Sequence, residues 1–364
     1  MAARAGSSGA VESRFRSLGC RPRRLRGGRR VAARSGIAKS LIGWYAHGHR
    51  DLPWRRTQEP YRIWVSEIML QQTRAQAVIP YYERFLQRFP TVEALGAASE
   101  HDVLALWSGL GYYSRARNLR KAAIAIHAAG GFPRDYDAIR ALPGIGDYTA
   151  AAVASIAFGL PHAVVDGNVL RVVARVEDDA SDIGAAATRE RFRTTVQDWL
   201  DPQQPGAFNQ ALMELGATVC LPRHPMCLVC PVASFCKSWE SGRAAELPVK
   251  LRKQEPVRIS GELLVIERRG RVLLRQRDSA ASRMAGFWDL PSPEDLPSAK
   301  RGAHLGEIRH TITHHHYTLA IRRATLEGRA GKAFRWFAPA ELTSIPFSTV
   351  ARKGLKAAGF VHNL

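Results

Sequence analysis

The sequence lacks several features whose absence limits what kind of protein it can encode. Its 364 residues contain no run of about 18 apolar residues, the length that a membrane-spanning helix needs. The N-terminus has no uninterrupted hydrophobic segment of the kind that secretory signals contain. We therefore expect neither a membrane span nor a secretory signal. The apolar content of 46% and the charged content of 23% are ordinary for globular proteins, and the length allows two domains.

Acidic residues are scarce. The chain has 32 Asp and Glu against 53 Lys and Arg, a formal net charge of +21. Residues 1–39 hold ten Arg and one Lys but only Glu12, which leaves +11 on the remaining chain. A basic body indicates a polyanionic partner, most often nucleic acid, although an Arg-rich GC-biased genome is an alternative. The composition of residues 1–35 is typical of a disordered basic arm or an organellar transit peptide.

Cysteine is rare and unevenly distributed. One of the five cysteines, Cys20, lies in the arm, and the others follow the spacing C-x6-C-x2-C-x5-C within residues 220–236, as Cys220, Cys227, Cys230 and Cys236. Without an export signal we do not expect disulfides. Zinc sites usually have two close pairs of ligands, whereas this spacing has one. Four thiolates in a short Pro-bearing loop favour a cubane iron–sulfur cluster, with zinc as the alternative.

The periodicity of the sequence changes once along the chain. Residues 36–240 read as helical, as in PYRIWVSEIMLQQ, where Tyr61, Trp64 and Ile68 recur at helical spacing. A charged, Pro-punctuated linker follows at residues 241–257.

Residues 258–364 read as an α+β domain. GELLVIERRGRVLLRQR predicts two short strands around a turn at Gly270, HTITHHHYTLAI alternates over a dozen residues, and TVARKGLKAAG predicts a closing helix. The predicted fold class is therefore multidomain, α and α+β, with an all-helical domain first.

The segment LPGIGDYTAAAVAS, residues 142–155, is typical of a helix-hairpin-helix. Gly144 and Gly146 allow a tight turn between two helices, where backbone N–H groups and the next helix's N-terminus can bind a phosphate oxygen. Such a hairpin binds the nucleic-acid backbone without reading its sequence. An ordinary Gly-capped junction between helices is the alternative.

Two carboxylates lie in segments with unusual patterns. Asp166 in VVDGNVLRVVAR stands where a helix N-cap is wanted, and capping is its default role. Glu67 in WVSEIMLQQT lies off the apolar stripe of its helix, so taken alone it is expected to be a solvated surface carboxylate. Together they suit the hydrolysis of a glycosidic bond, in which one acid protonates the leaving group and one carboxylate stabilises an oxocarbenium-like centre.

Five segments together resemble the MutY-type adenine DNA glycosylases, members of the helix-hairpin-helix glycosylase superfamily with endonuclease III. They are YRIWVSEIMLQQT, GLGYYSRARNL, LPGIGDYT, VDGNV and the cysteine spacing, and the resemblance runs from about residue 40 to the end. It implies a helix-hairpin-helix glycosylase domain with a [4Fe-4S] cluster, followed by a Nudix-like domain. The implied partner is double-stranded DNA containing 8-oxoguanine·A or G·A mispairs, and the implied reaction is excision of the adenine.

The resemblance also implies catalytic roles. Glu67 is expected to protonate adenine, Asp166 to stabilise the cationic sugar, and Asn168 to help position the sugar or water. Tyr148 stands where many bifunctional relatives have lysine, and a phenol cannot form the Schiff base that an amine forms. Leu170 stands where some MutY-type sequences have lysine after VDGNV. We therefore expect a monofunctional enzyme.

Contacts with DNA follow from the same resemblance. Gln72 and Tyr112 are expected to fill the space that the extruded base leaves and to wedge beside the lesion partner. Trp54, Arg55 and Gln210 match positions that line the adenine pocket, where an amide suits the edge of the base.

The C-terminal domain lacks the acidic signature of diphosphate-hydrolysing Nudix enzymes, so that activity is not expected. Ile312, Thr313 and His314 match a Phe-Ser-His segment that touches 8-oxoguanine in the family, with an aliphatic side chain in place of the aromatic ring. We expect no metal at the histidine run that continues through His315 and His316, because alternating strand faces would separate the rings.

Two other interpretations stay open from the sequence. One is an endonuclease III-like enzyme acting on oxidised pyrimidines, which Tyr148 and the extra C-terminal domain disfavour. The other is a non-catalytic iron–sulfur DNA-binding protein, which needs neither Glu67 nor Asp166. We expect a monomer in the bacterial cytoplasm, associated with the nucleoid, with organellar targeting by the Arg-rich arm as the alternative.

Overall fold

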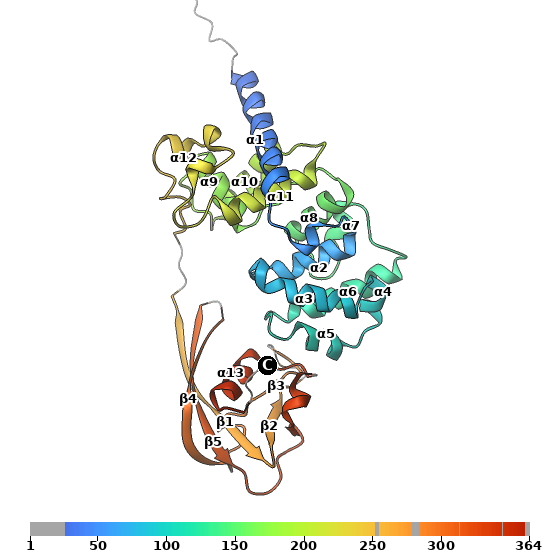
Figure 1. Ribbon diagram of the computed structural model, residues 1–364, viewed down its shortest axis with the longest axis vertical. Coiled ribbons are helices and arrows are strands. Elements are labelled where there is room, and N and C mark those ends of the chain that lie inside the picture. Colours follow the sequence, from blue (N-terminus) through green and yellow to red (C-terminus); the bar gives the residue numbers. More distant parts are fainter. Residues whose placement is uncertain are drawn as a thin grey trace, which may run out of the picture.

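A helical domain is followed by a smaller domain built on a β-sheet (Figure 1). The computed structural model describes residues 26–251, 255–278, 281, 284–312, 314–343 and 345–360. This arrangement confirms the predicted fold class. No helix within these residues is long and apolar enough to cross a membrane.

The helical domain begins with a long helix. The helices and 3-10 turns are α1 (Arg26–Gly48), η1 (Pro53–Arg55), α2 (Pro60–Leu70), α3 (Ala75–Arg88), α4 (Val92–Ala97), α5 (Glu100–Trp107), α6 (Ser114–Ala128), α7 (Tyr136–Arg140), α8 (Asp147–Phe158), α9 (Gly167–Val176), α10 (Ala186–Trp199), α11 (Pro205–Thr218), η2 (Cys227–Val229), η3 (Ala233–Phe235) and α12 (Lys237–Glu240). Since α1 starts at Arg26, residues 26–35 are helical, whereas the sequence predicted that they belong to a disordered arm. Residues 1–25, including Cys20, lie outside the described part.

Helix α2 forms as its sequence predicts. Pro60 occupies the first turn, and the side chain of Glu59 accepts hydrogen bonds from the backbone N–H groups of Tyr61 and Arg62, which caps the helix. Tyr61 and Trp64 are buried in a core shared by α2 to α6 and α8. A second core joins α1 to α9, α10 and α11. The helix-hairpin-helix lies at the end of the first core.

The C-terminal domain is a mixed sheet. Its elements are β1 (Val257–Arg268), β2 (Arg271–Gln276), β3 (Trp288–Asp289), β4 (Lys300–Ile312), β5 (His315–Thr325), β6 (Phe334–Phe337), η4 (Pro339–Thr343) and α13 (Thr349–Ala357). The strand order is β3-β2-β1-β5-β4, β6 pairs with β2, and β1 with β5 is the parallel pair. The alternating segment HTITHHHYTLAI is not one strand: it contains the end of β4 and most of β5, which pair antiparallel with Ile312 opposite His315.

The two domains pack against each other at the segment between α5 and α6. The ring of Phe287 is fully buried in the core of the helical domain, with its centroid 4.1 Å from that of Tyr113. Ser108 Oγ donates to the carbonyl of Phe347 at 3.0 Å and accepts from Arg352 Nη2 at 3.1 Å. The C-terminal domain therefore rests directly on the segment that contains Tyr112.

Candidate active site

Glu67 is buried rather than solvated. Only 5% of the residue is exposed, because α8 packs across α2 and covers the side that the periodicity of α2 left polar. The hydroxyl of Tyr148 on α8 donates to Glu67 Oε2 at 2.7 Å. The pKa of Glu67 is raised to about 7: burial is the main cause and the nearby charge of Asp166 adds to the rise, while the hydrogen bond from Tyr148 and the charge of Arg55 oppose it. The expectation of a surface carboxylate is therefore wrong.

Asp166 caps a helix and lies near enough to Glu67 for its charge to raise the pKa of Glu67. Its Oδ1 accepts from the backbone N–H of Val169 at 2.7 Å, which confirms the predicted N-cap of α9. Its Oδ2 accepts from Asn168 Nδ2 at 2.9 Å. Burial raises the pKa of Tyr148 well above its usual value, and the charges of both carboxylates add to the rise. The fold thus brings the two acids and Tyr148 into one site, although 99 positions separate Glu67 from Asp166 in the chain.

Asn168 is held by an arginine that sequence reasoning missed. Arg171 Nη2 donates to Asn168 Oδ1 at 2.9 Å and to the carbonyl of Gly216 at 2.7 Å, while its Nε donates to the carbonyl of Cys220 at 2.8 Å. A Cβ at Gly216 would lie 2.7 Å from the Cβ of Asn168, so glycine there permits the close approach of α11. The helical spacing of three residues from Asn168 to Arg171 was the available signal.

Trp54 and Arg55 lie in the short turn η1. Trp54 is buried, with its ring edge-on to Tyr82 at 5.5 Å. Arg55 Nη2 forms an ion pair with Glu214 Oε2 at 2.6 Å, and the positive charge of Arg55 lowers the pKa of Glu67. The guanidinium therefore lies near the acid and is already held by another group.

Glu214 on α11 is a buried acid that sequence reasoning also missed. Its side chain is 1% exposed and binds both Arg50 and Arg55. Burial alone would raise the pKa of Glu214, but the hydrogen bonds from the two arginines outweigh it and hold the pKa at about 2. One helical turn earlier, Gln210 Oε1 accepts from the hydroxyl of Tyr45 at 3.1 Å. Tyr45 thus links Gln210 to Arg55, because the Arg55 guanidinium lies 5.3 Å from the centroid of the Tyr45 ring.

The predicted helix-hairpin-helix is formed by α7 and α8. Gly144 has φ of 75°, and a Cβ there would lie 2.5 Å from the Cβ of Asn118, so both conformation and space require glycine. Gly146 is the N-cap of α8 and provides no side chain to its first turn. The first-turn amides of α8 therefore have no side-chain cap, which suits an anion.

Gln72 and Tyr112 share an unusual backbone conformation. Gln72, which follows α2, has φ of 59°, and Tyr112, in the loop before α6, has φ of 49°. Both side chains are exposed, Tyr112 by 41%. Positive φ is strained for a residue with a Cβ and is concentrated at functional sites.

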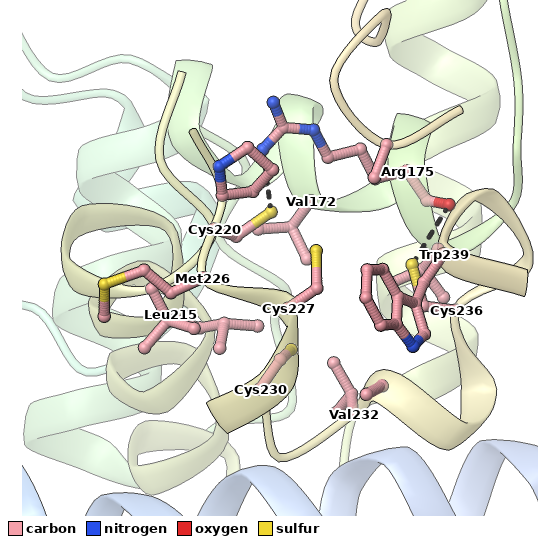
Figure 2. A pocket seen from close by; sticks show the side chains of 15 residues that line it. Val172, Arg175, Leu215, Cys220, Met226, Cys227, Cys230, Val232, Cys236 and Trp239 are labelled. Atoms are coloured by element: carbon pink, nitrogen blue, oxygen red, sulfur yellow. Dashed lines mark hydrogen bonds between the residues drawn. The ribbon is translucent and has the colours of Figure 1, made fainter. Parts of the chain in front are cut away.

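The four clustered cysteines line one pocket beside α9 (Figure 2). All four are half-buried free thiols, and Arg175 Nη1 donates to Cys220 Sγ at 3.2 Å. Burial raises the pKa of Cys230 to about 11. The side chains converge without forming a closed ligand group within the described residues. Four soft sulfur donors with a cationic neighbour nevertheless fit an iron–sulfur cluster.

Two of the predicted lesion-reading residues, Ile312 and His314, lie where β4 ends and before β5 begins. Ile312 ends β4, Thr313 lies outside the described residues, and the carbonyl of His314 accepts from the backbone N–H of Val257 at 2.8 Å. The rings of His314 and His315 have centroids 4.2 Å apart, so the expectation that alternating strand faces would separate the rings is wrong for this pair: His315 begins β5, whereas His314 lies before it in the turn. The turn is therefore attached to the first strand of the domain, while the roles of Thr313 and His314 stay predictions.

Comparisons with known proteins define the class of the chain. Residues 65–198 match the family model described as HhH-GPD superfamily base excision DNA repair protein, and residues 262–357 match a NUDIX domain. The chain thus combines an HhH-GPD domain with a NUDIX domain. It is 34% identical to human adenine DNA glycosylase over 89% of this chain and 74% of that protein, and 33% identical to the rat protein over 89% and 78%. The chain belongs to the adenine DNA glycosylase family.

The helical domain also resembles a solved structure. A thermostable thymine-DNA glycosylase is 28% identical and superimposes with a TM-score of 0.52, covering 58% of this chain and 98% of that one. Similarity to adenine DNA glycosylases extends to plants, since the Arabidopsis thaliana protein is 38% identical over 73% of this chain and 49% of its own length.

Proposed function

We propose that this protein is a monofunctional adenine DNA glycosylase that removes adenine mispaired with 8-oxoguanine or guanine in base excision repair. One observation carries the proposal: a buried Glu67 with a pKa of about 7 accepts a hydrogen bond from Tyr148 beside Asp166. An acid with a pKa near neutrality can donate a proton and regain it, which is what an acid catalyst needs. The relatives that match most of the chain are named adenine DNA glycosylases.

In this mechanism Glu67 donates its proton to a ring nitrogen of the extruded adenine as the N-glycosidic bond breaks. The bonding electrons leave with adenine, and the sugar becomes an oxocarbenium-like cation. The carboxylate of Asp166, oriented by Val169 N–H and Asn168, stabilises that cation. Water then adds to the anomeric carbon and gives a proton to the Glu67 carboxylate, which leaves an abasic site and restores the acid.

The mechanism includes no strand cleavage. Tyr148 has a hydroxyl where a lyase needs an amine, so no Schiff base forms at that position. Its role here is to orient Glu67 through the 2.7 Å hydrogen bond. The abasic strand therefore stays intact until alkali cleaves it.

The DNA contacts of the proposal come from separate parts of the chain. Gln72 and Tyr112 occupy the stack that adenine leaves, and the hairpin at Gly144 and Gly146 binds a phosphate. The extruded base enters the site near Arg55 and Gln210, with Trp54 in the wall. Thr313 and His314 contact the 8-oxoguanine partner.

A [4Fe-4S] cluster held by Cys220, Cys227, Cys230 and Cys236 belongs to the proposal. Bound there, the cluster supplies a rigid centre that fixes the loop, and it takes no part in bond cleavage. The loop carries Arg223 and His224, which are exposed and can approach the DNA backbone. We propose that the protein acts as a monomer in the bacterial cytoplasm, on nucleoid DNA.

Single-turnover cleavage of four duplexes tests the proposal. They contain A opposite 8-oxoguanine, A opposite G, A opposite T, and an oxidised pyrimidine opposite G, and each reaction is analysed with and without alkali. We expect adenine loss opposite 8-oxoguanine, with strand breaks only after alkali. Breaks at the oxidised pyrimidine without alkali would instead identify an endonuclease III-like lyase. Absence of product from every duplex, with DNA binding retained, would identify a non-catalytic binding protein.

A further inference from the structure

Arg115, at the start of α6, binds the backbone of two separate segments. Its Nη1 donates to the carbonyls of Ile68, Met69 and Gln71 at 2.8, 3.1 and 2.6 Å. Its Nη2 donates to the carbonyls of Leu110 and Gly111 at 3.3 and 3.1 Å. One guanidinium thus joins the C-terminal end of α2 to the loop before α6, and Arg115 itself stands 44 positions after Gln71 in the chain.

The two segments are those that end in the strained residues. Gln71 is followed directly by Gln72, with φ of 59°, and Gly111 is followed directly by Tyr112, with φ of 49°. The Arg115 guanidinium also lies 5.5 Å from the ring centroid of Tyr112. A positive φ at a residue with a Cβ persists only when the surrounding structure holds it. Arg115 provides hydrogen bonds to the residue before each of them.

The chemistry of arginine suits this task. The planar guanidinium presents donors in a rigid fork, so the carbonyls that it binds are held at set positions relative to one another. Only 9% of the residue is exposed, and burial lowers the pKa of Arg115 to about 10, which leaves it charged at neutral pH. Within the described part of the chain, Arg115 donates its hydrogen bonds to backbone carbonyls and to no carboxylate. Its charge therefore strengthens bonds to the backbone.

We propose that Arg115 is a positioning residue that sets the separation of Gln72 and Tyr112, so that both side chains can enter the base stack together while adenine is extruded. The proposal rests on the proposed function and adds the residue that couples its two intercalating groups. Arg115 itself touches no reacting atom; it acts through the two backbones that it joins.

The first test is Arg115→Lys, which keeps the charge but replaces the fork with a single ammonium. Because a displacement of about 1 Å can lower a rate by about 100-fold, we expect single-turnover adenine release to fall by about 10- to 100-fold. Arg120→Lys is the matched control: Arg120 lies on the same helix, and its Nε donates to the carbonyl of Ala98 at 2.6 Å. Its rate should stay within about twofold of wild type.

Coupling separates positioning from a general structural role. In a Gln72→Ala, Tyr112→Ala background the side chains that Arg115 positions are absent, so adding Arg115→Lys should lower the rate by no more than about twofold. Full additivity of the two effects would overturn the proposal.

A second measurement does not depend on base excision. In a Glu67→Gln background, 2-aminopurine placed beside the target adenine reports unstacking by its fluorescence. We expect Arg115→Lys to reduce the fluorescence rise at saturating protein, and Arg120→Lys to leave it unchanged. An unchanged rise in Arg115→Lys would overturn the proposal. Adenine release by Glu67→Gln itself would instead refute the proposed function, which keeps the two failures distinct.

Thermal unfolding provides a third measurement in case Arg115→Lys folds poorly. Glycine adopts positive φ without strain, so a Gln72→Gly, Tyr112→Gly protein depends less on the hydrogen bonds that Arg115 donates to the two segments. We expect Arg115→Lys to lower Tm less in that background than in the wild type. An equal decrease would mean that Arg115 supports the core rather than the two strained residues.

Discussion

The hydroxyl of Tyr148 sets the pH range in which Glu67 can act as an acid. The pKa of Glu67 is about 7 with the Tyr148 hydrogen bond in place; burial raises this pKa, and the hydrogen bond opposes the rise because it stabilises the carboxylate. Tyr148→Phe removes the hydroxyl and keeps the ring. Since a hydrogen bond to a charged group contributes about 1.5–3 kcal/mol and one pKa unit corresponds to about 1.4 kcal/mol, we expect the pKa to rise by about 1 to 2 pH units.

The assay is the single-turnover rate of adenine release as a function of pH. The acid must be protonated, so the wild-type rate should fall as the pH rises through about 7. In Tyr148→Phe the midpoint of that fall should move about 1 to 2 pH units higher, while the rate on the plateau drops because Glu67 is less well oriented. Tyr136→Phe is the control, because Tyr136 lies on α7, stacks on the ring of His162 and has no contribution from Glu67 to its pKa. A midpoint that is unchanged, or that moves lower, would refute the reasoning.

The remaining predictions concern the effect of Glu67 on stability, the orientation of Asn168 by Arg171, the cluster ligand Cys227 and the packing of the two domains at Phe287. Because the pKa of Glu67 in the folded protein lies above its usual value of 4.5, the free energy of unfolding decreases as the pH rises from 4.5 to about 7. Measured by urea unfolding, Glu67→Gln should therefore raise the free energy of unfolding by about 3 kcal/mol at pH 8 but change it little at pH 4. Arg171→Gln should slow adenine release by about tenfold or more with its iron content unchanged, since the side chain orients Asn168; an unchanged rate would contradict that role. Cys227→Ser should remove iron and the brown colour of the pure protein, whereas retained iron would show that this sulfur is not a ligand. Phe287→Ala should weaken domain docking by about 3 kcal/mol and speed proteolysis within residues 241–257, where Leu251 and Val257 are already exposed; an unchanged digest would show that other contacts suffice.

Patterns that depend on neighbouring residues were readable from the sequence. The apolar spacing of PYRIWVSEIMLQQ predicted α2 and its buried face, and Pro60 marked its first turn. The position of Asp166 before an apolar helix predicted the cap that its Oδ1 makes. LPGIGDYT predicted a hairpin in which Gly144 does take a positive φ. Each of these features is satisfied within a few residues, so composition and spacing are sufficient to recognise it.

Other assignments needed the family resemblance as well as the residues. Taken alone, the periodicity of α2 placed Glu67 in solvent; the pairing with Asp166 suited hydrolysis of a glycosidic bond, and the resemblance assigned the role of the acid to Glu67. Residues 26–35 were predicted to be part of a disordered arm because they are Arg-rich, yet they form the start of α1. Local charge was a poor guide there, since helix formation does not depend on net charge alone.

The sequence by itself determined the class of fold, the hairpin, the cap at Asp166 and the clustering of the cysteines. Only the tertiary structure decided that Glu67 is buried, because α8 must pack across α2 before water is excluded and the pKa rises to about 7. The same is true of the contacts that Arg115 makes with the end of α2, 44 to 47 positions away, and of those that Glu214 makes with two arginines 159 and 164 positions away. Short-range sequence patterns specify individual helices, turns and caps. The environment of a charged side chain depends on which helices pack against it, and this is determined only by the tertiary structure.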